Sequence, residues 1–183
     1  VYLYILFFII MSAVSQVSVY IWHGKVKAYK TMSASMEPTL AKGDHVMVML
    51  NDGSYSPGRG DVVVVLIPGD RRKAYIKRIV GLPGETIQMN SDSILINGKP
   101  LYESYLPNTQ GLSKDSLSVT IPANAIFVLG DNRANSLDSR NFGPIPMESV
   151  LGKVVVIHWS WSEDWTPRWK RIGTVLSPTS SLP

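Results

Sequence analysis

The sequence contains no cysteine and little charge of either sign. Its 183 residues include not one Cys, which excludes disulfide bridges, Cys-ligated metal sites and Cys nucleophiles. The 18 basic and 14 acidic residues give a net charge of +4, and no run of Lys and Arg exceeds three residues. Recognition of nucleic acid requires a denser basic surface than this. We therefore expect no nucleic-acid partner.

Histidine is also scarce, with only His23, His45 and His158 in the chain. No two His, Asp or Glu residues share the spacing typical of metal ligands. None of the histidines forms a recognisable pattern with an aspartate, so each is interpreted as an ordinary packed or exposed side chain. We expect no metal and no other cofactor.

The first 22 residues contain no charged side chain. As a helix rising about 1.5 Å per residue, this segment is long enough to cross the hydrocarbon core of a bilayer, which is about 30 Å thick. A cleavable signal peptide and a buried core helix are the two alternatives. The length favours a single transmembrane anchor over residues 1–22. Basic residues follow the segment, but the charge on one flank alone does not set the orientation.

Beyond the anchor, short runs rich in β-branched residues alternate with turns that contain Gly and Pro. The Asn97-Gly98 pair predicts a two-residue hairpin. The pattern predicts a mainly β, antiparallel domain over residues 23–173. The stretch at about 90–120, rich in Ser and Asn, is expected to be a small inserted β subdomain, and residues 174–183 a disordered tail. The clearest predicted strands cover residues 44–50, 61–67, 74–80, 93–101, 125–130 and 149–159.

The segment SASMEPTL at residues 33–40 places two serines close together just after the anchor. A serine nucleophile needs a base, and a neutral lysine can serve where a histidine does not. Lys77 lies in the apolar segment AYIKRIV, where strand alternation puts Tyr75 and Ile79 on its face. Burial there would lower the lysine pKa from about 10.4. The alternative is that Lys77 faces solvent on an edge strand.

A third polar segment, GDNRANSLDSR at residues 130–140, follows directly after an apolar run. A loop so rich in hydrogen-bonding side chains is either a solvated turn or the support of a functional site. The pattern alone favours neither interpretation.

Three segments, in order behind the apolar run, are SASMEPTL at residues 33–40, YIKRIVGLPGE at residues 75–85 and LGDNRANSLDSRNFGPIP at residues 129–146. Together they resemble the bacterial type I signal (leader) peptidases, over roughly residues 29–156. The resemblance implies a serine endopeptidase with a Ser/Lys dyad that removes signal peptides from exported preproteins. It implies the signal-peptidase type of antiparallel β catalytic domain.

The resemblance also implies roles for individual residues. Ser35 matches the nucleophile and Lys77 the general base, while the Ser33 hydroxyl and the Ser35 backbone N–H match the oxyanion hole. Ser136 matches a serine that orients the lysine. Structural support around the site is implied for Asp131, Asn132, Arg133, Asp138 and Arg140, of which the last two match an ion pair. Shallow substrate pockets are implied at Tyr29, Thr31, Met36, Leu40, Tyr75 and Ile76.

The chain departs from the family pattern at three positions. Met32 and Ala34 stand where the family usually has Pro and Gly, and Ala134 replaces an acidic residue. A side chain at position 34 would be unfavourable if the backbone there had a positive φ.

The resemblance implies a bacterial inner (cytoplasmic) membrane location, single-pass, with the catalytic domain on the outer side. Preproteins and membrane lipid are the implied partners, and a monomer is expected. The Trp-rich segment at residues 158–169 is open to two interpretations, membrane contact or internal packing. Two rival functions remain, a self-cleaving Ser/Lys peptidase of the repressor type and an inactive membrane-anchored β protein that binds signal peptides or other partners.

Overall fold

The computed structural model describes residues 5–6, 24–68, 70–106 and 116–176. The anchor predicted over residues 1–22 therefore lies outside the described residues, apart from Ile5 and Leu6 in a helical turn. In the part of the chain that is described, no helix is both long and apolar enough to cross a membrane.

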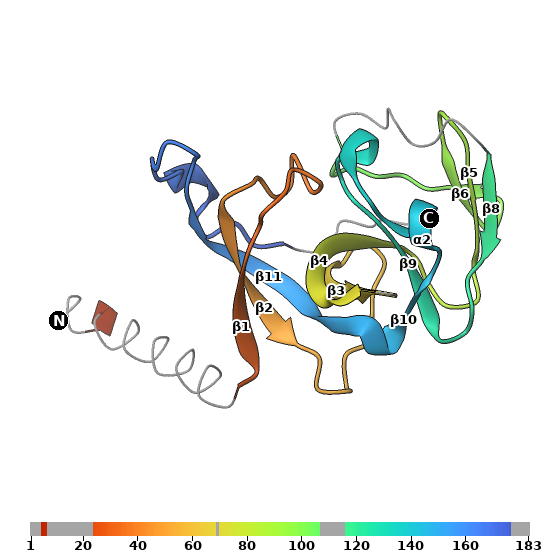
Figure 1. The fold of residues 1–183 in the computed structure, drawn as a ribbon, viewed down its shortest axis with the longest axis horizontal. Coiled ribbons are helices and arrows are strands. Elements are labelled where there is room, and N and C mark those ends of the chain that lie inside the picture. Colours follow the sequence, from red (N-terminus) through yellow and green to blue (C-terminus); the bar gives the residue numbers. More distant parts are fainter. Residues whose placement is uncertain (1–4, 7–23, 69, 107–115, 177–183) are drawn as a thin grey trace.

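The main body is a seven-stranded sheet in which every pair of neighbouring strands is antiparallel (Figure 1). Its central strands are rich in Val and Ile because both faces of the sheet are covered by apolar side chains. In spatial order the strands are β1 (Val26–Lys30), β2 (Asp44–Leu50), β11 (Val150–Ser160), β3 (Val62–Ile67), β4 (Asp70–Gly81), β9 (Ala125–Leu129) and β10 (Ile145–Pro146). The mainly β, antiparallel prediction is confirmed.

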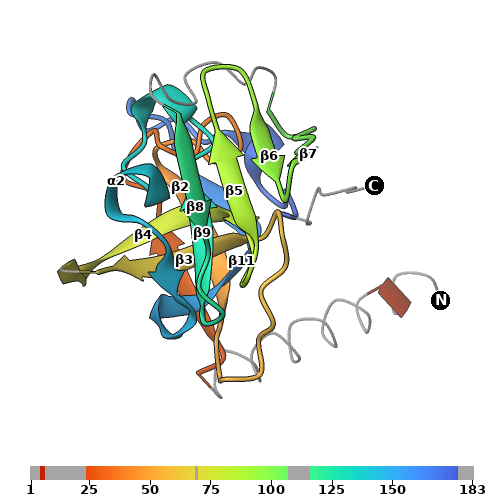
Figure 2. The same cartoon turned by 90° about the vertical axis from the view of Figure 1, so that its right-hand side faces the viewer.

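A second, four-stranded sheet lies beside the β9 end of the first, as Figure 2 shows. Its order is β7 (Lys99–Pro100), β6 (Ile94–Ile96), β5 (Thr86–Met89) and β8 (Leu117–Thr120). Asn97 and Gly98 both have positive φ and join β6 to β7, so the predicted hairpin turn is confirmed. The sequence predicts a small inserted β subdomain at about 90–120. The second sheet begins slightly earlier, at Thr86.

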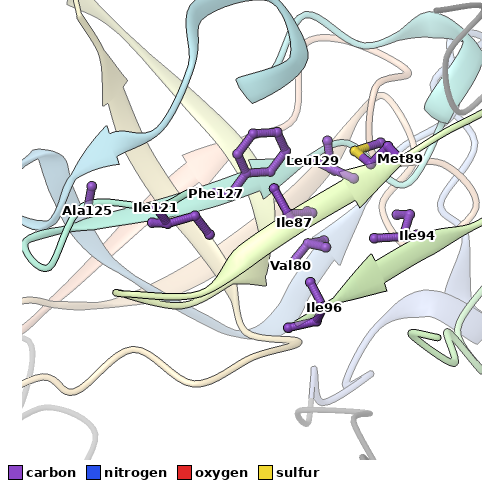
Figure 3. Packing of buried hydrophobic residues seen from close by; sticks show 9 residues of the cluster. All are labelled: Val80, Ile87, Met89, Ile94, Ile96, Ile121, Ala125, Phe127 and Leu129. Carbon is purple, nitrogen blue, oxygen red and sulfur yellow. The ribbon is translucent and has the colours of Figure 1, made fainter. Parts of the chain in front are cut away.

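One hydrophobic cluster joins the two sheets. Figure 3 shows its nine side chains gathered between β5, β6, β9 and the end of β4. Phe127 of β9 is the largest of them and is fully buried. This packing fixes the second sheet against the strands that carry the candidate site.

Short helical turns are present at η1 (Arg133–Asn135), α2 (Ser139–Phe142), η2 (Met147–Ser149) and η3 (Trp169–Arg171).

The end of the described chain turns back onto the main sheet. After η3, Val175 bridges to Val156, and the Leu176 N–H donates to the Val155 carbonyl. The tail predicted to be disordered from residue 174 is therefore paired with β11 over residues 174–176, and residues 177–183 lie outside the described part.

The Trp-rich segment forms an aromatic cluster over the end of β11. Trp159 makes edge contacts with Trp161 and Trp169, at centroid distances of 5.5 and 5.8 Å. Trp165 and Trp169 are nevertheless largely exposed. Packing thus accounts for the inner part of the segment, and a membrane contact stays a prediction.

Candidate active site

Ser35 and Lys77 are brought into direct contact by the fold. Ser35 lies in the turns that connect β1 to β2, and Lys77 lies in the middle of β4. The Lys77 Nζ is 2.7 Å from the Ser35 Oγ, within hydrogen-bonding distance. One edge of β4 pairs with β3 along its length, whereas among the described residues β9 pairs with the other edge only from Arg78 onward. This second edge is therefore unpaired at Lys77, where the amine reaches the serine.

The amine of Lys77 is held in a dry environment. The residue is only 2% exposed, which rules out the solvent-facing alternative. Burial lowers the pKa of Lys77 from 10.5 to about 8. The nearby Asp138 and Asp131 carboxylates raise the pKa and so oppose this shift, and the Arg140 charge lowers it slightly further. At pH 7 roughly one amine in ten is therefore neutral, far more than for an ordinary lysine, and the neutral form is the state a general base requires.

Ser33 lies next to the Ser35 hydroxyl. Its Oγ donates to the Ser35 Oγ at 3.2 Å, so both serines of the SASMEPTL segment belong to one site. Within the described ranges, Asn97 and Trp165 are the non-glycine residues with positive φ. The Ala34 backbone is not left-handed, and the methyl group that replaces the family's usual Gly carries no conformational penalty there.

The loop after β9 packs directly against Ser35 and Ala34. The Asn132 side chain donates to the Ala34 carbonyl at 3.1 Å, and the Asn132 N–H donates to the Ser35 carbonyl at 3.1 Å. A Cβ at Gly130 would lie 2.1 Å from the Ser136 Oγ and 2.5 Å from the Ser35 carbonyl oxygen. Glycine is therefore required where Ser136 and Ser35 approach the end of β9.

Ser136 lies in this crowded region, but its hydrogen bond to the lysine is not observed. The Ser136 Oγ is buried and has no hydrogen-bond partner among the described groups. Its role in orienting Lys77 stays a prediction that rests on the resemblance.

The charged residues of the loop form buried ion pairs instead of a solvated turn. Arg140 pairs with Asp138 at 2.9 Å, and Asp138 also accepts from the Gly130 N–H at 3.0 Å. Arg78 donates to both carboxylate oxygens of Asp131, at 2.8 and 2.6 Å. These pairs fix the loop relative to β4 and to the end of β9.

Sequence reasoning missed two partners of this network. Arg133 makes a two-pronged contact with Glu103, at 2.8 and 2.6 Å, and the Arg78 guanidinium stacks over the Tyr105 ring at 3.8 Å. Glu103 and Tyr105 follow the hairpin of the second sheet. No local signal marks them, because their importance arises only when that segment folds against the catalytic loop.

A groove leads to the two reactive atoms. It encloses about 340 Å³ and is lined by residues that include Ser33, Ser35 and Lys77. Thr31, Met36, Tyr75 and Ile76, four of the six predicted pocket residues, line it. Tyr29 and Leu40 do not, and they pack in the cluster that contains Met36. Lys30, Met32, Lys73 and Ala74 also line the groove, and of these Lys30, Lys73 and Ala74 were not predicted.

No group of three or more His, Asp or Glu residues is arranged to bind a metal ion within the described ranges. The chemistry available at the groove is that of a hydroxyl beside a buried amine.

The sequence is similar to those of known signal peptidases. The family model "Signal peptidase, peptidase S26" matches residues 2–159. A signal peptidase I of Leptolyngbya laminosa is 38% identical over 135 residues, which cover 69% of this chain and 66% of that protein. A signal peptidase I of Bacillus amyloliquefaciens is 38% identical over 141 residues, covering 71% and 72%.

A crystal structure of a signal peptidase I from Enterococcus faecalis V583 is 34% identical, covers 54% of this chain and 97% of that one, and superposes with a TM-score of 0.48. The family match covers most of the chain and includes Ser35 and Lys77. The chain therefore belongs to the signal peptidase, peptidase S26 family, the serine peptidases that cleave signal peptides.

Proposed function

We propose that Ser35 is the nucleophile and Lys77 the general base in the cleavage of signal peptides from preproteins. The observation that carries the proposal is the 2.7 Å approach of the buried Lys77 amine to the Ser35 hydroxyl. The neutral amine takes the hydroxyl proton as the Oγ attacks the scissile carbonyl, and an acyl-enzyme forms at Ser35. The resulting ammonium protonates the leaving amine, and Lys77 then activates water for deacylation.

The Ser33 hydroxyl and the Ser35 N–H are proposed to stabilise the oxyanion of each tetrahedral intermediate. Ser33 is near enough to do so, because its hydroxyl already contacts the Ser35 Oγ. Removal of one such donor typically costs about 10²- to 10³-fold in rate.

The substrate is proposed to bind as an extended strand along the open edge of β4. An exposed strand edge can accept a peptide through main-chain hydrogen bonds, with alternate side chains entering pockets. Ala74, Tyr75 and Ile76 lie along this edge and line the groove. The family resemblance adds a preference for small residues one and three positions before the cut, at pockets that involve Thr31, Met36 and Ile76.

Residues 1–22 are proposed to anchor the chain in the bacterial cytoplasmic membrane, with the catalytic domain on the outer side. Members of the signal peptidase family are membrane proteins with an extracytoplasmic catalytic domain. The uncharged first segment is long enough for such an anchor. An anchor would hold the groove near the bilayer surface, where it raises the effective concentration of membrane-bound preproteins.

Ser35→Ala and Lys77→Ala test the dyad directly. Each variant removes one of the two reactive groups, so we expect each to lower the rate of cleavage of a signal-peptide substrate by at least about 10³-fold. Ser54→Ala, an exposed serine outside the groove, serves as the control and is expected to cleave at the rate of the unmodified chain. Near-normal cleavage by either dyad variant would contradict the assignment.

The pH dependence of cleavage should report the lowered pKa of Lys77. Only the neutral amine can accept the serine proton, so kcat/KM should rise about tenfold per pH unit below about pH 8 and level off above it. Circular dichroism over the same pH range separates titration from unfolding. A kcat/KM that does not change between pH 6 and 8 in folded protein would rule out Lys77 as the base.

Gly130→Ala tests the close packing behind the nucleophile. The added methyl group would overlap the Ser136 hydroxyl and the Ser35 carbonyl, so the loop or the nucleophile has to shift. A displacement of about 1 Å can cost on the order of 10²-fold in rate, and we expect a loss of that size. Gly58→Ala, where the nearest contact would be 3.3 Å from a side chain, is the control. Equal kcat for Gly130→Ala and the unmodified chain would show that this packing does not position Ser35.

A further inference from the structure

The nucleophile is carried by a loop that is closed at its base. The Thr31 N–H donates to the Asp44 carbonyl at 2.8 Å, and the Gly43 N–H donates to the Thr31 carbonyl at 2.9 Å. Residues 31–44 therefore leave and rejoin the main sheet at one point, as in an Ω-loop. The position of Ser35 then depends on how this loop is attached to its surroundings.

Arg171, at the end of η3, binds the loop at two separate points. Its Nε and Nη2 donate to the Asp44 carboxylate, with a shortest distance of 2.6 Å, and its Nη2 donates to the Thr39 carbonyl at 2.9 Å. Asp44 is fully buried. Burial raises its pKa, but hydrogen bonds from Arg171 and Ser160 outweigh that effect and keep the pKa below its usual value. A charged carboxylate thus fixes the guanidinium at the base of the loop.

Thr39 is also bound by β4, the strand that carries Lys77. The Arg78 Nη2 donates to the Thr39 Oγ1 at 3.2 Å, and Arg78 is the residue after Lys77 in β4. One threonine therefore links the strand that carries the base, the loop that carries the nucleophile and the segment that carries Arg171. Because Thr39 lies four residues after Ser35, a shift of Thr39 would change the distance from the Ser35 Oγ to the Lys77 Nζ.

We propose that Arg171 is a positioning residue for Ser35, which sets the geometry of the dyad through Thr39 and Asp44. The inference rests on the proposed function, because it requires Ser35 to be the nucleophile. Arg171 makes no contribution to the groove lining. It makes no direct contact with a peptide in the groove, so its loss should lower kcat more than it raises KM.

The matched control is Lys153 of β11. Arg171 and Lys153 each approach a buried aspartate to 2.6 Å, and their side chains are 26% and 27% exposed. The partner of Lys153 is Asp61, which lies outside the loop. Lys153→Gln thus removes a similar ion pair without touching the attachment of the nucleophile.

The experiment measures kcat, KM and the thermal midpoint for Arg171→Gln, Arg171→Lys and Lys153→Gln in the detergent-solubilised chain. We expect Arg171→Gln to lower kcat by about 10- to 100-fold with KM unchanged within about twofold. Lys153→Gln should lower the midpoint to a similar extent and leave kcat unchanged. Arg171→Lys keeps a cation beside Asp44 but loses the planar fork that also reaches Thr39, so it should fold normally and show a smaller loss of kcat.

Unchanged kcat in both Arg171 variants would overturn the inference, as would an equal loss of kcat in Lys153→Gln. If Arg171→Gln does not fold, the result for Arg171→Lys decides. A reduced kcat at constant KM in Arg171→Lys would support the positioning role, and an unchanged kcat would refute it. Ser35→Ala distinguishes a failure of the proposed nucleophile from a failure of the proposed role of Arg171. Cleavage by Ser35→Ala would refute the proposed function itself, whereas an inactive Ser35→Ala beside fully active Arg171 variants would refute only the role of Arg171.

Discussion

The proposed chemistry depends on the burial of the Lys77 amine beside the Ser35 hydroxyl. A lysine in water is protonated at neutral pH and cannot accept a proton from a serine. At position 77 the loss of water lowers the pKa to about 8, although two aspartates nearby oppose the shift. The apolar strands around β4 therefore do more than stabilise the fold, since they create the neutral base. Any opening that admitted water to Lys77 would weaken the site even if every side chain stayed in place.

Three arginines hold the irregular segments around the Lys77 amine in place. Arg78, Arg133 and Arg140 each pair with a carboxylate and also donate to backbone carbonyls. Planar guanidinium groups suit this task because one group can satisfy several acceptors in a fixed geometry. Their carboxylate partners lie in the loop after β9 and, for Arg133, in the segment after β7, so the chain that follows the second sheet contacts the site through Glu103 without lining the groove. Buried pairs of this kind are weak evidence for stability, but here they join the loop after β9 to β4 and to the segment after β7.

Much of the site could be predicted from the sequence, because its motifs are local. The position of Lys77 in an apolar strand and the Asn97-Gly98 hairpin follow from periodicity and turn chemistry, and the family resemblance led to Ser35 as the partner of Lys77. The contacts of Glu103 with Arg133 and of Arg171 with Asp44 could not be predicted, since they join segments 30 and 127 residues apart. Composition marked an insertion at about 90–120, whereas the second sheet already begins at Thr86, because Thr86 to Met89 reads as an ordinary strand of the main domain. The predicted disorder from residue 174 overlooked backbone pairing to β11, which leaves no side-chain signal.

The central claim is that burial lowers the pKa of Lys77 to about 8 in the folded protein, so that far more of the amine is neutral near physiological pH than in an exposed lysine. The most direct test is a titration of the Lys77 side chain by nuclear magnetic resonance in lysine-labelled protein, with the resonance assigned by its absence in Lys77→Ala. The account predicts a midpoint near pH 8 for Lys77, well below that of exposed lysines, which titrate near pH 10.4. A midpoint at or above about 10 in the folded protein would contradict the account, because burial would then not supply the base.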